Sequence, residues 1–116
     1  MLPAAHRMRA AADFTDTTRR GTKVARGPVV VYLLGSDDPH PARAGLIVGK
    51  VVGGSVERHR AARRIRAALG PLMAELAPGT RIVVRALPGA DTDPALAGAV
   101  AEAVAAARAG RRGGRL

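Results

Sequence analysis

The chain has 116 residues, of which 47% are hydrophobic, so it can bury one compact core rather than two. Its 19 Lys and Arg face only 9 Asp and Glu, and the resulting formal charge of +10 repels itself unless a polyanion compensates it. The absence of cysteine excludes disulfides and cysteine nucleophiles, and no apolar run approaches the roughly 20 residues that cross a bilayer. We therefore expect a cytoplasmic protein whose partner is nucleic acid or an anionic membrane surface.

The first half of the chain predicts one helix and a pair of strands. Residues 10–20 form a short helix that stops at Gly21. After Gly27-Pro28, the β-branched and apolar run 29–34 is short enough to be a buried strand. A polar turn with two prolines follows, and the pattern predicts that residues 44–50 are the hairpin partner of that strand.

The second half predicts helix, strand and helix. Ser55 can cap a helix over residues 56–69, which ends at Gly70-Pro71. A strand follows over residues 80–86, bounded on both sides by Pro and Gly. Asp93 and Pro94 then open a last helix, which runs to about Arg108.

These elements fit a single domain over residues 1–109. The remaining residues, 110–116, are basic and rich in glycine, a composition typical of disordered segments. We expect them to form a disordered basic tail.

The predicted helix over residues 56–69 separates apolar from basic side chains. At about 100° per residue, its Ala, Ile and Leu residues fall within an arc of roughly 120°, and the basic arc of roughly 160° contains Arg60, Arg63, Arg64 and Arg66. A merely solvated face would mix acids among the bases, yet Glu57 is the only acid nearby. A membrane-surface helix would carry larger apolar residues than alanine. The pattern therefore predicts that guanidinium groups bind the phosphates of RNA or DNA.

The sequence lacks the residues with which a protein enzyme would itself cleave RNA. His6, His40 and His59 have no metal-ligand spacing, and no His and carboxylate set suggests a general acid and base. The acid pairs Asp37-Asp38 and Asp91 with Asp93 fall among turn and capping residues, which explains them without a metal. We predict no catalytic residue and no metal ligand in this chain.

The stretch from Gly53 to Arg66 resembles the signature of the bacterial ribonuclease P protein, in which Arg-Asn-Arg is followed by a basic pair and an apolar residue before another base. His59 stands where that family usually has Asn, and Ala62 stands where it usually has Lys. Arg7-Met8 and Asp13-Phe14 look like two further N-terminal elements of the family. The similarity covers about residues 6–108.

This resemblance implies an α+β fold, with a mixed four-stranded sheet packed with about three helices. It also implies a left-handed strand-helix-strand crossover, as in the second domain of ribosomal protein S5. Most strand-helix-strand connections in known proteins are right-handed, so their frequency alone would favour that hand. The handedness is thus an expectation that comes from the resemblance only.

The family's protein is a subunit of an endoribonuclease whose chemistry is performed by a catalytic RNA with Mg²⁺. The resemblance implies two partners, that RNA and precursor tRNA, with no membrane and no obligate protein partner; the Mg²⁺ would be held mainly by the RNA. It implies a leader cleft lined by Phe14 and Tyr32. It also implies RNA contacts from Lys50, from Arg7 and from the signature residues Arg58, His59, Arg60, Arg63, Arg64 and Arg66.

Three other interpretations fit parts of the sequence. A ribosomal or nucleoid-type protein would share the charge and the small size, and reconstitution with a catalytic RNA would separate it from the ribonuclease P protein. An independent metal-dependent nuclease would act without RNA, and a membrane-surface protein would bind liposomes. Phe14 and Tyr32, the only two aromatic residues, also fit a purely structural role in the core.

Overall fold

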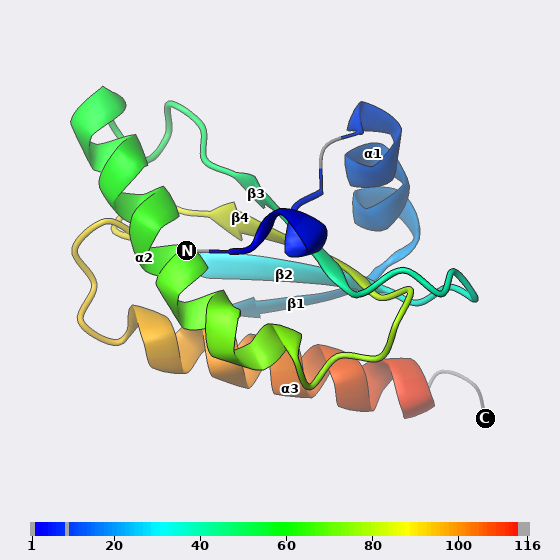
Figure 1. The fold of residues 1–116 in the computed structure, drawn as a ribbon. Helices are drawn as coiled ribbons and strands as arrows, with labels where there is room; N and C mark the ends of the chain where they lie inside the picture. Colours follow the sequence, from blue (N-terminus) through cyan, green and yellow to red (C-terminus); the bar gives the residue numbers. More distant parts are fainter. Residues whose placement is uncertain (1, 9, 114–116) are drawn as a thin grey trace.

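The computed structural model describes residues 2–8 and 10–113, which form a sheet with helices on both faces (Figure 1). The elements in chain order are η1 (Ala4–His6), α1 (Ala11–Arg20), β1 (Thr22–Arg26), β2 (Val29–Leu34), β3 (Arg43–Ile47), α2 (Ser55–Met73), β4 (Arg81–Ala86) and α3 (Leu96–Gly113). The helix that carries Phe14 and the strands predicted over residues 29–34 and 80–86 are confirmed.

The four strands form a mixed sheet in the order β1-β2-β4-β3. β2 is antiparallel to both β1 and β4, whereas β3 runs parallel to β4. Gly27 and Pro28 connect β1 to β2, and Gly27 has a φ of 49°, as expected for glycine at the first position of a type II′ hairpin loop. The predicted α+β class and mixed four-stranded sheet are confirmed, while the left-handed sense of the β3-α2-β4 crossover stays a prediction.

Helices α2 and α3 pack on one face of the sheet, and α1 covers part of the other (Figure 1). The main core lies under α2 and α3, where burying each large aliphatic side chain contributes about 1.5–3 kcal/mol. Its fully buried members include Ile65 and Leu69 of α2, Val100 of α3, and Val31 and Val84 of the sheet. A smaller cluster on the α1 face contains Met8, Val30, Tyr32 and Val83, with Phe14, Ile47 and Leu87 packed against it.

The N-terminal segment lies along the outer edge of β3. The His6 Nδ1 atom is 2.7 Å from the carbonyl oxygen of Ala42. Arg7 forms a parallel bridge with Ala44, and the N–H of Met8 donates to the Ala44 carbonyl oxygen at 2.8 Å. These bonds fix Arg7 beside the strand that leads into α2.

One strand pairing is predicted wrongly, and one strand is missing from the prediction. The hairpin partner of β2 is β1, which the sequence reading missed because its alternate residues Lys23 and Ala25 are exposed and give no continuous apolar run. Residues 44–50 do not pair with β2, since β1 and β4 occupy both of its edges. β3 ends at Ile47 and pairs with β4 instead.

Helix α2 differs from its prediction at both ends. It continues through Gly70-Pro71 to Met73, because Leu69 and Met73 are both buried in the core and their packing outweighs the hydrogen bond that proline removes. The N-cap is Gly54 rather than Ser55, and the Glu57 Oε1 atom accepts the Gly54 N–H at 3.1 Å. A negative side chain in this first turn also suits the helix dipole.

Helix α3 begins at Leu96 rather than Pro94, although the Asp93 carboxylate does accept the N–H of Ala95 at 2.8 Å. The helix extends to Gly113, so residues 110–113 are helical, whereas the sequence analysis predicts that they are disordered. At Gly110 the helix still lies against β1, because an added Cβ would be 3.4 Å from the Thr22 methyl group. The rest of the predicted tail, residues 114–116, lies outside the described residues.

Two glycines with similar positive φ angles differ in their surroundings, and this difference yields a stability prediction. Gly79 and Gly89 have φ values of 83° and 94°. A Cβ at Gly79 would lie 2.5 Å from the Ser36 carbonyl oxygen, whereas a Cβ at Gly89 has nothing within 4 Å. We expect Gly89→Ala to lower the free energy of unfolding by about 1–2 kcal/mol and Gly79→Ala to lower it clearly more. Urea denaturation measures both, and equal losses would contradict the close approach at Gly79.

Candidate nucleic-acid interface

Two arginines of the predicted basic face of α2 contact the loop between β4 and α3. Arg64 donates from Nη1 to the Ala90 carbonyl oxygen at 3.1 Å and from Nη2 to the Asp93 carbonyl oxygen at 2.6 Å. Arg60 lies 3.6 Å from Asp91, measured from Nη1 to Oδ2. Arg64 thus stabilises the protein itself, and Arg60 has a carboxylate partner within the protein. The sequence held no signal that separates Arg64 from the others, since Arg64 and Arg66 fall at the two margins of the basic arc.

The other side of α2 leaves its cations accessible. His59, Arg63 and Arg66 are exposed, and their side chains make no hydrogen bond or ion pair with residues 2–8 or 10–113. Lys50 is also exposed, in the turn that precedes α2. Because no carboxylate neutralises them within the described structure, these groups can bind phosphate oxygens without first breaking an internal pair.

The side chain of Arg58 is half-buried and lies next to the accessible side of α2 that carries His59 and Arg66. Its Nε atom is buried and has no hydrogen-bond partner among the described residues. A buried donor without a partner costs about 1–3 kcal/mol, so an anion that reached it would relieve that cost. Beside Arg58, a pocket of about 410 Å³ is lined by Leu46, Val48, Ser55, His59, Ala62 and Arg66.

Phe14 rests directly on the backbone of β3. Its ring is half-buried, and a Cβ at Gly45 would overlap the ring atoms Cε1 and Cζ. A glycine at position 45 therefore allows the aromatic ring to approach the strand. The exposed part of the ring lines a pocket at the β3 edge.

That pocket, of about 440 Å³, brings together three parts of the chain. Phe14 comes from α1, Arg7 from the N-terminal segment and Arg66 from α2, while Ala44, Gly45 and Leu46 of β3 complete the lining together with Leu2 and Met8. In a pocket that holds an aromatic ring and two guanidinium groups, the ring can stack on a base and the guanidinium groups can bind phosphates. Sequence reasoning proposed all three residues, and the structure places them around one pocket.

Tyr32 is only 6% exposed, so most of its ring is packed in the cluster on the α1 face. Two cations flank it: Lys23 Nζ is 5.9 Å and Arg85 Cζ is 5.7 Å from the ring centroid. Sequence reasoning missed both cations. For Arg85 the signal was present, since strand alternation places it on the same face as Val83.

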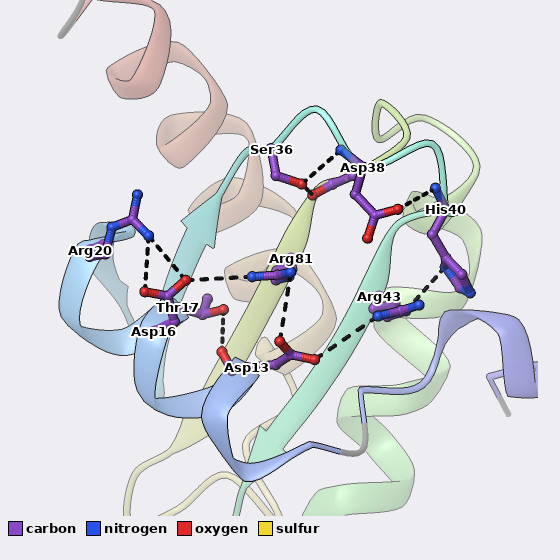
Figure 2. A network of polar contacts seen from close by, with 10 residues as sticks. Asp13, Asp16, Thr17, Arg20, Ser36, Asp38, His40, Arg43 and Arg81 are labelled. Atoms are coloured by element: carbon purple, nitrogen blue, oxygen red, sulfur yellow. Dashed lines mark hydrogen bonds and ion pairs between the residues drawn. The ribbon is translucent and has the colours of Figure 1, made fainter.

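A polar network anchors α1 to the sheet on the same face (Figure 2). Asp13 of α1 lies 4.0 Å from Arg43 of β3 and 3.7 Å from Arg81 of β4. Asp16 pairs with Arg81 at 3.5 Å and with Arg20 at 3.0 Å. Sequence reasoning did not single out this network, because its members come from three separate elements.

The described part of the chain shows no group of three His, Asp or Glu side chains that could hold a metal ion. Over the same residues, no helix is both long and apolar enough to span a bilayer. Exposed cations and a half-buried aromatic ring lie together on this surface, and their chemistry suits phosphate groups and base stacking.

Comparison with known proteins identifies the family. The family model described as Ribonuclease P matches residues 2–106. The ribonuclease P protein component of Mycolicibacterium paratuberculosis is 46% identical over 96 residues, which cover 79% of this chain and 81% of that protein. The corresponding protein of Mycolicibacterium vanbaalenii is 50% identical over 91 residues, which cover 76% of each chain.

Solved structures agree with the fold. The RNase P protein of Staphylococcus aureus superposes with a TM-score of 0.76 at 24% identity, over 88% of this chain and 94% of that one. The match of the family model to nearly the whole chain and the identity to its relatives lead to the same conclusion: this chain belongs to the ribonuclease P protein family.

Proposed function

We propose that the chain, as a ribonuclease P protein component, binds the catalytic RNA and the 5′ leader of precursor tRNA, and so assists the endonucleolytic cut that produces the mature 5′ end. The match over residues 2–106 carries this proposal. Cleavage takes place on the RNA subunit, and the protein supplies affinity and orientation. Since transcription produces precursor tRNA in the bacterial cytoplasm, we propose that the protein acts there.

The accessible side of α2 is proposed to contact the catalytic RNA. Arg63 and Arg66 present uncompensated guanidinium groups, which suit the planar geometry of phosphate oxygens. His59 lies on the same side and can donate a hydrogen bond or stack on a base. Arg60 is proposed to exchange its partner Asp91 for a phosphate, and Arg64 is proposed to support the adjoining loop.

The pocket at the β3 edge is proposed to accept part of the single-stranded leader. Stacking on an aromatic ring contributes roughly 1–3 kcal/mol per base and demands no particular sequence. Phe14 offers the stacking face, and Arg7 and Arg66 line the same pocket and can bind phosphates. Tyr32 is proposed to support this site mainly from within the sheet, because so little of its ring is exposed.

Mg²⁺ is proposed to be held by RNA phosphates. The described residues offer no cluster of carboxylates and imidazoles that would bind the ion in the protein. The ion would stabilise the attacking and leaving oxygens of the phosphate, while basic residues of the protein lower the Mg²⁺ concentration that the folded RNA requires.

Reconstitution tests the proposal directly. The purified chain, added to a ribonuclease P RNA at low Mg²⁺, is expected to restore site-specific cleavage of a precursor tRNA, because its positive charge replaces part of the counterion requirement. Gel analysis of the 5′ end measures the cut. The chain without RNA should not cleave, and a chelator-sensitive cut by the protein alone would contradict an RNA-catalysed reaction.

The division among the arginines predicts two different variant phenotypes. Replacing Arg63 and Arg66 with Ala should weaken binding to the catalytic RNA and reduce the slope of log affinity against log salt by roughly 0.7–0.9 for each lost phosphate contact. Arg64→Ala, the matched control on the same helix, should lower the melting temperature and leave the slope unchanged, because it removes bonds to Ala90 and Asp93. If Arg64→Ala changes the salt slope and the Arg63 and Arg66 variant does not, the assignment of RNA binding to Arg63 and Arg66 and of a structural role to Arg64 is wrong.

The leader pocket predicts a selective effect of Phe14→Leu. Leucine keeps the apolar volume and removes the stacking face, so affinity for a precursor with a leader should fall while affinity for mature tRNA changes little. Fluorescence anisotropy with the reconstituted holoenzyme measures both affinities. Equal loss for the two RNAs would assign Phe14 to the core alone.

A further inference from the structure

Helix α1 buries little apolar surface against the sheet. Thr17 is the only one of its ten residues that is buried, and the hydroxyl group of Thr17 donates within the helix, to the Asp13 carbonyl oxygen at 2.7 Å. Phe14 is half-buried on Gly45. Hydrophobic packing alone therefore contributes less to the position of α1 than it does for α2 and α3.

The sheet beneath α1 presents two like charges side by side. Arg43 of β3 and Arg81 of β4 are direct partners in the parallel register. Like charges that face each other on neighbouring strands destabilise a sheet. The pair therefore needs a counter-charge from outside the sheet.

Asp13 supplies that counter-charge to both arginines. Its Oδ2 atom is 4.0 Å from Arg43 Nη1, and its Oδ1 atom is 3.7 Å from Arg81 Nη2, so one carboxylate joins α1 to two strands (Figure 2). The three side chains are 21–28% exposed, which means that solvent screens them less than it screens a fully exposed pair. Asp16 adds a second contact from α1 to Arg81.

We propose that Asp13 is a positioning residue for leader recognition, an inference that rests on the proposed leader pocket. Asp13 precedes Phe14 in the chain, so the ion pairs that anchor Asp13 also fix where α1 places the aromatic ring. They hold the ring on Gly45, at the wall of the pocket that contains Arg7 and Arg66.

The same carboxylate limits unselective binding. Without it, Arg43 has no carboxylate partner among the described residues and Arg81 keeps only Asp16, so both guanidinium groups attract RNA phosphates more strongly. Loss of Asp13 therefore has two consequences of opposite sign. General affinity for RNA is kept or rises, while the preference for a leader falls because Phe14 is no longer fixed.

The test uses Asp13→Asn in the reconstituted holoenzyme, with affinities measured by fluorescence anisotropy for a precursor with a leader and for mature tRNA. The ratio of the two affinities is expected to fall roughly fivefold, equivalent to about 1 kcal/mol, while affinity for mature tRNA stays the same or increases. Asp37→Asn is the matched control. It makes the same charge change at an exposed residue that has no ion pair within the described structure, and the ratio should not change.

A second variant covers the case in which Asp13→Asn fails to fold. Arg43→Gln removes one of the two arginines and leaves the Asp13 to Arg81 pair, so the ratio should fall by a smaller factor. An equal loss of affinity for both RNAs, or an unchanged ratio in both variants, would overturn the proposal.

Phe14→Leu separates the two possible failures. If Phe14→Leu lowers the ratio and the Asp13 and Arg43 variants do not, the leader pocket stands and the positioning role is wrong. If the wild-type holoenzyme itself shows no preference for a leader, the proposed function of the pocket fails first.

Discussion

Nineteen basic side chains must fold together with nine acidic ones, and the fold depends on where those few carboxylates lie. Asp13 and Asp16 pair with arginines beneath and beside α1. Asp91 pairs with Arg60, and Glu102 lies 3.8 Å from Arg26 where α3 crosses β1. The acids thus stabilise contacts between elements, and the accessible side of α2 is left with positive charge that no described residue neutralises.

The two proposed RNA sites lie on opposite faces of the sheet but meet at one edge. α2 packs on one face and α1 on the other, and a pocket lined by β3 residues brings together Phe14 of α1 and Arg66 of α2. Small residues at Ala44 and Gly45 let side chains from both helices reach the same pocket. A strand of large side chains in this place would separate Phe14 from Arg66, and a leader could not contact both at once.

Local patterns predicted what local interactions determine. The helix that contains Phe14, the strand at residues 29–34 and the basic character of α2 follow from periodicity and composition within short windows. β1 was missed because it lies at the edge of the sheet, where polar residues are tolerated. The parallel pairing of β3 with β4, the continuation of α2 past Pro71 and the contacts of Arg64 depend on residues far apart in sequence, which no short window contains.

The N-terminal segment and the charges on β1 protect the two open edges of the sheet. Arg7 and Met8 occupy backbone groups of β3 that would otherwise be free, and β1 carries exposed Lys23 and Arg26 along the opposite edge. Unprotected edges invite strand pairing between copies and hence aggregation, and charged residues or a covering segment prevent it. A protein that is translated separately from its RNA partner can therefore accumulate as individual molecules until that RNA is available.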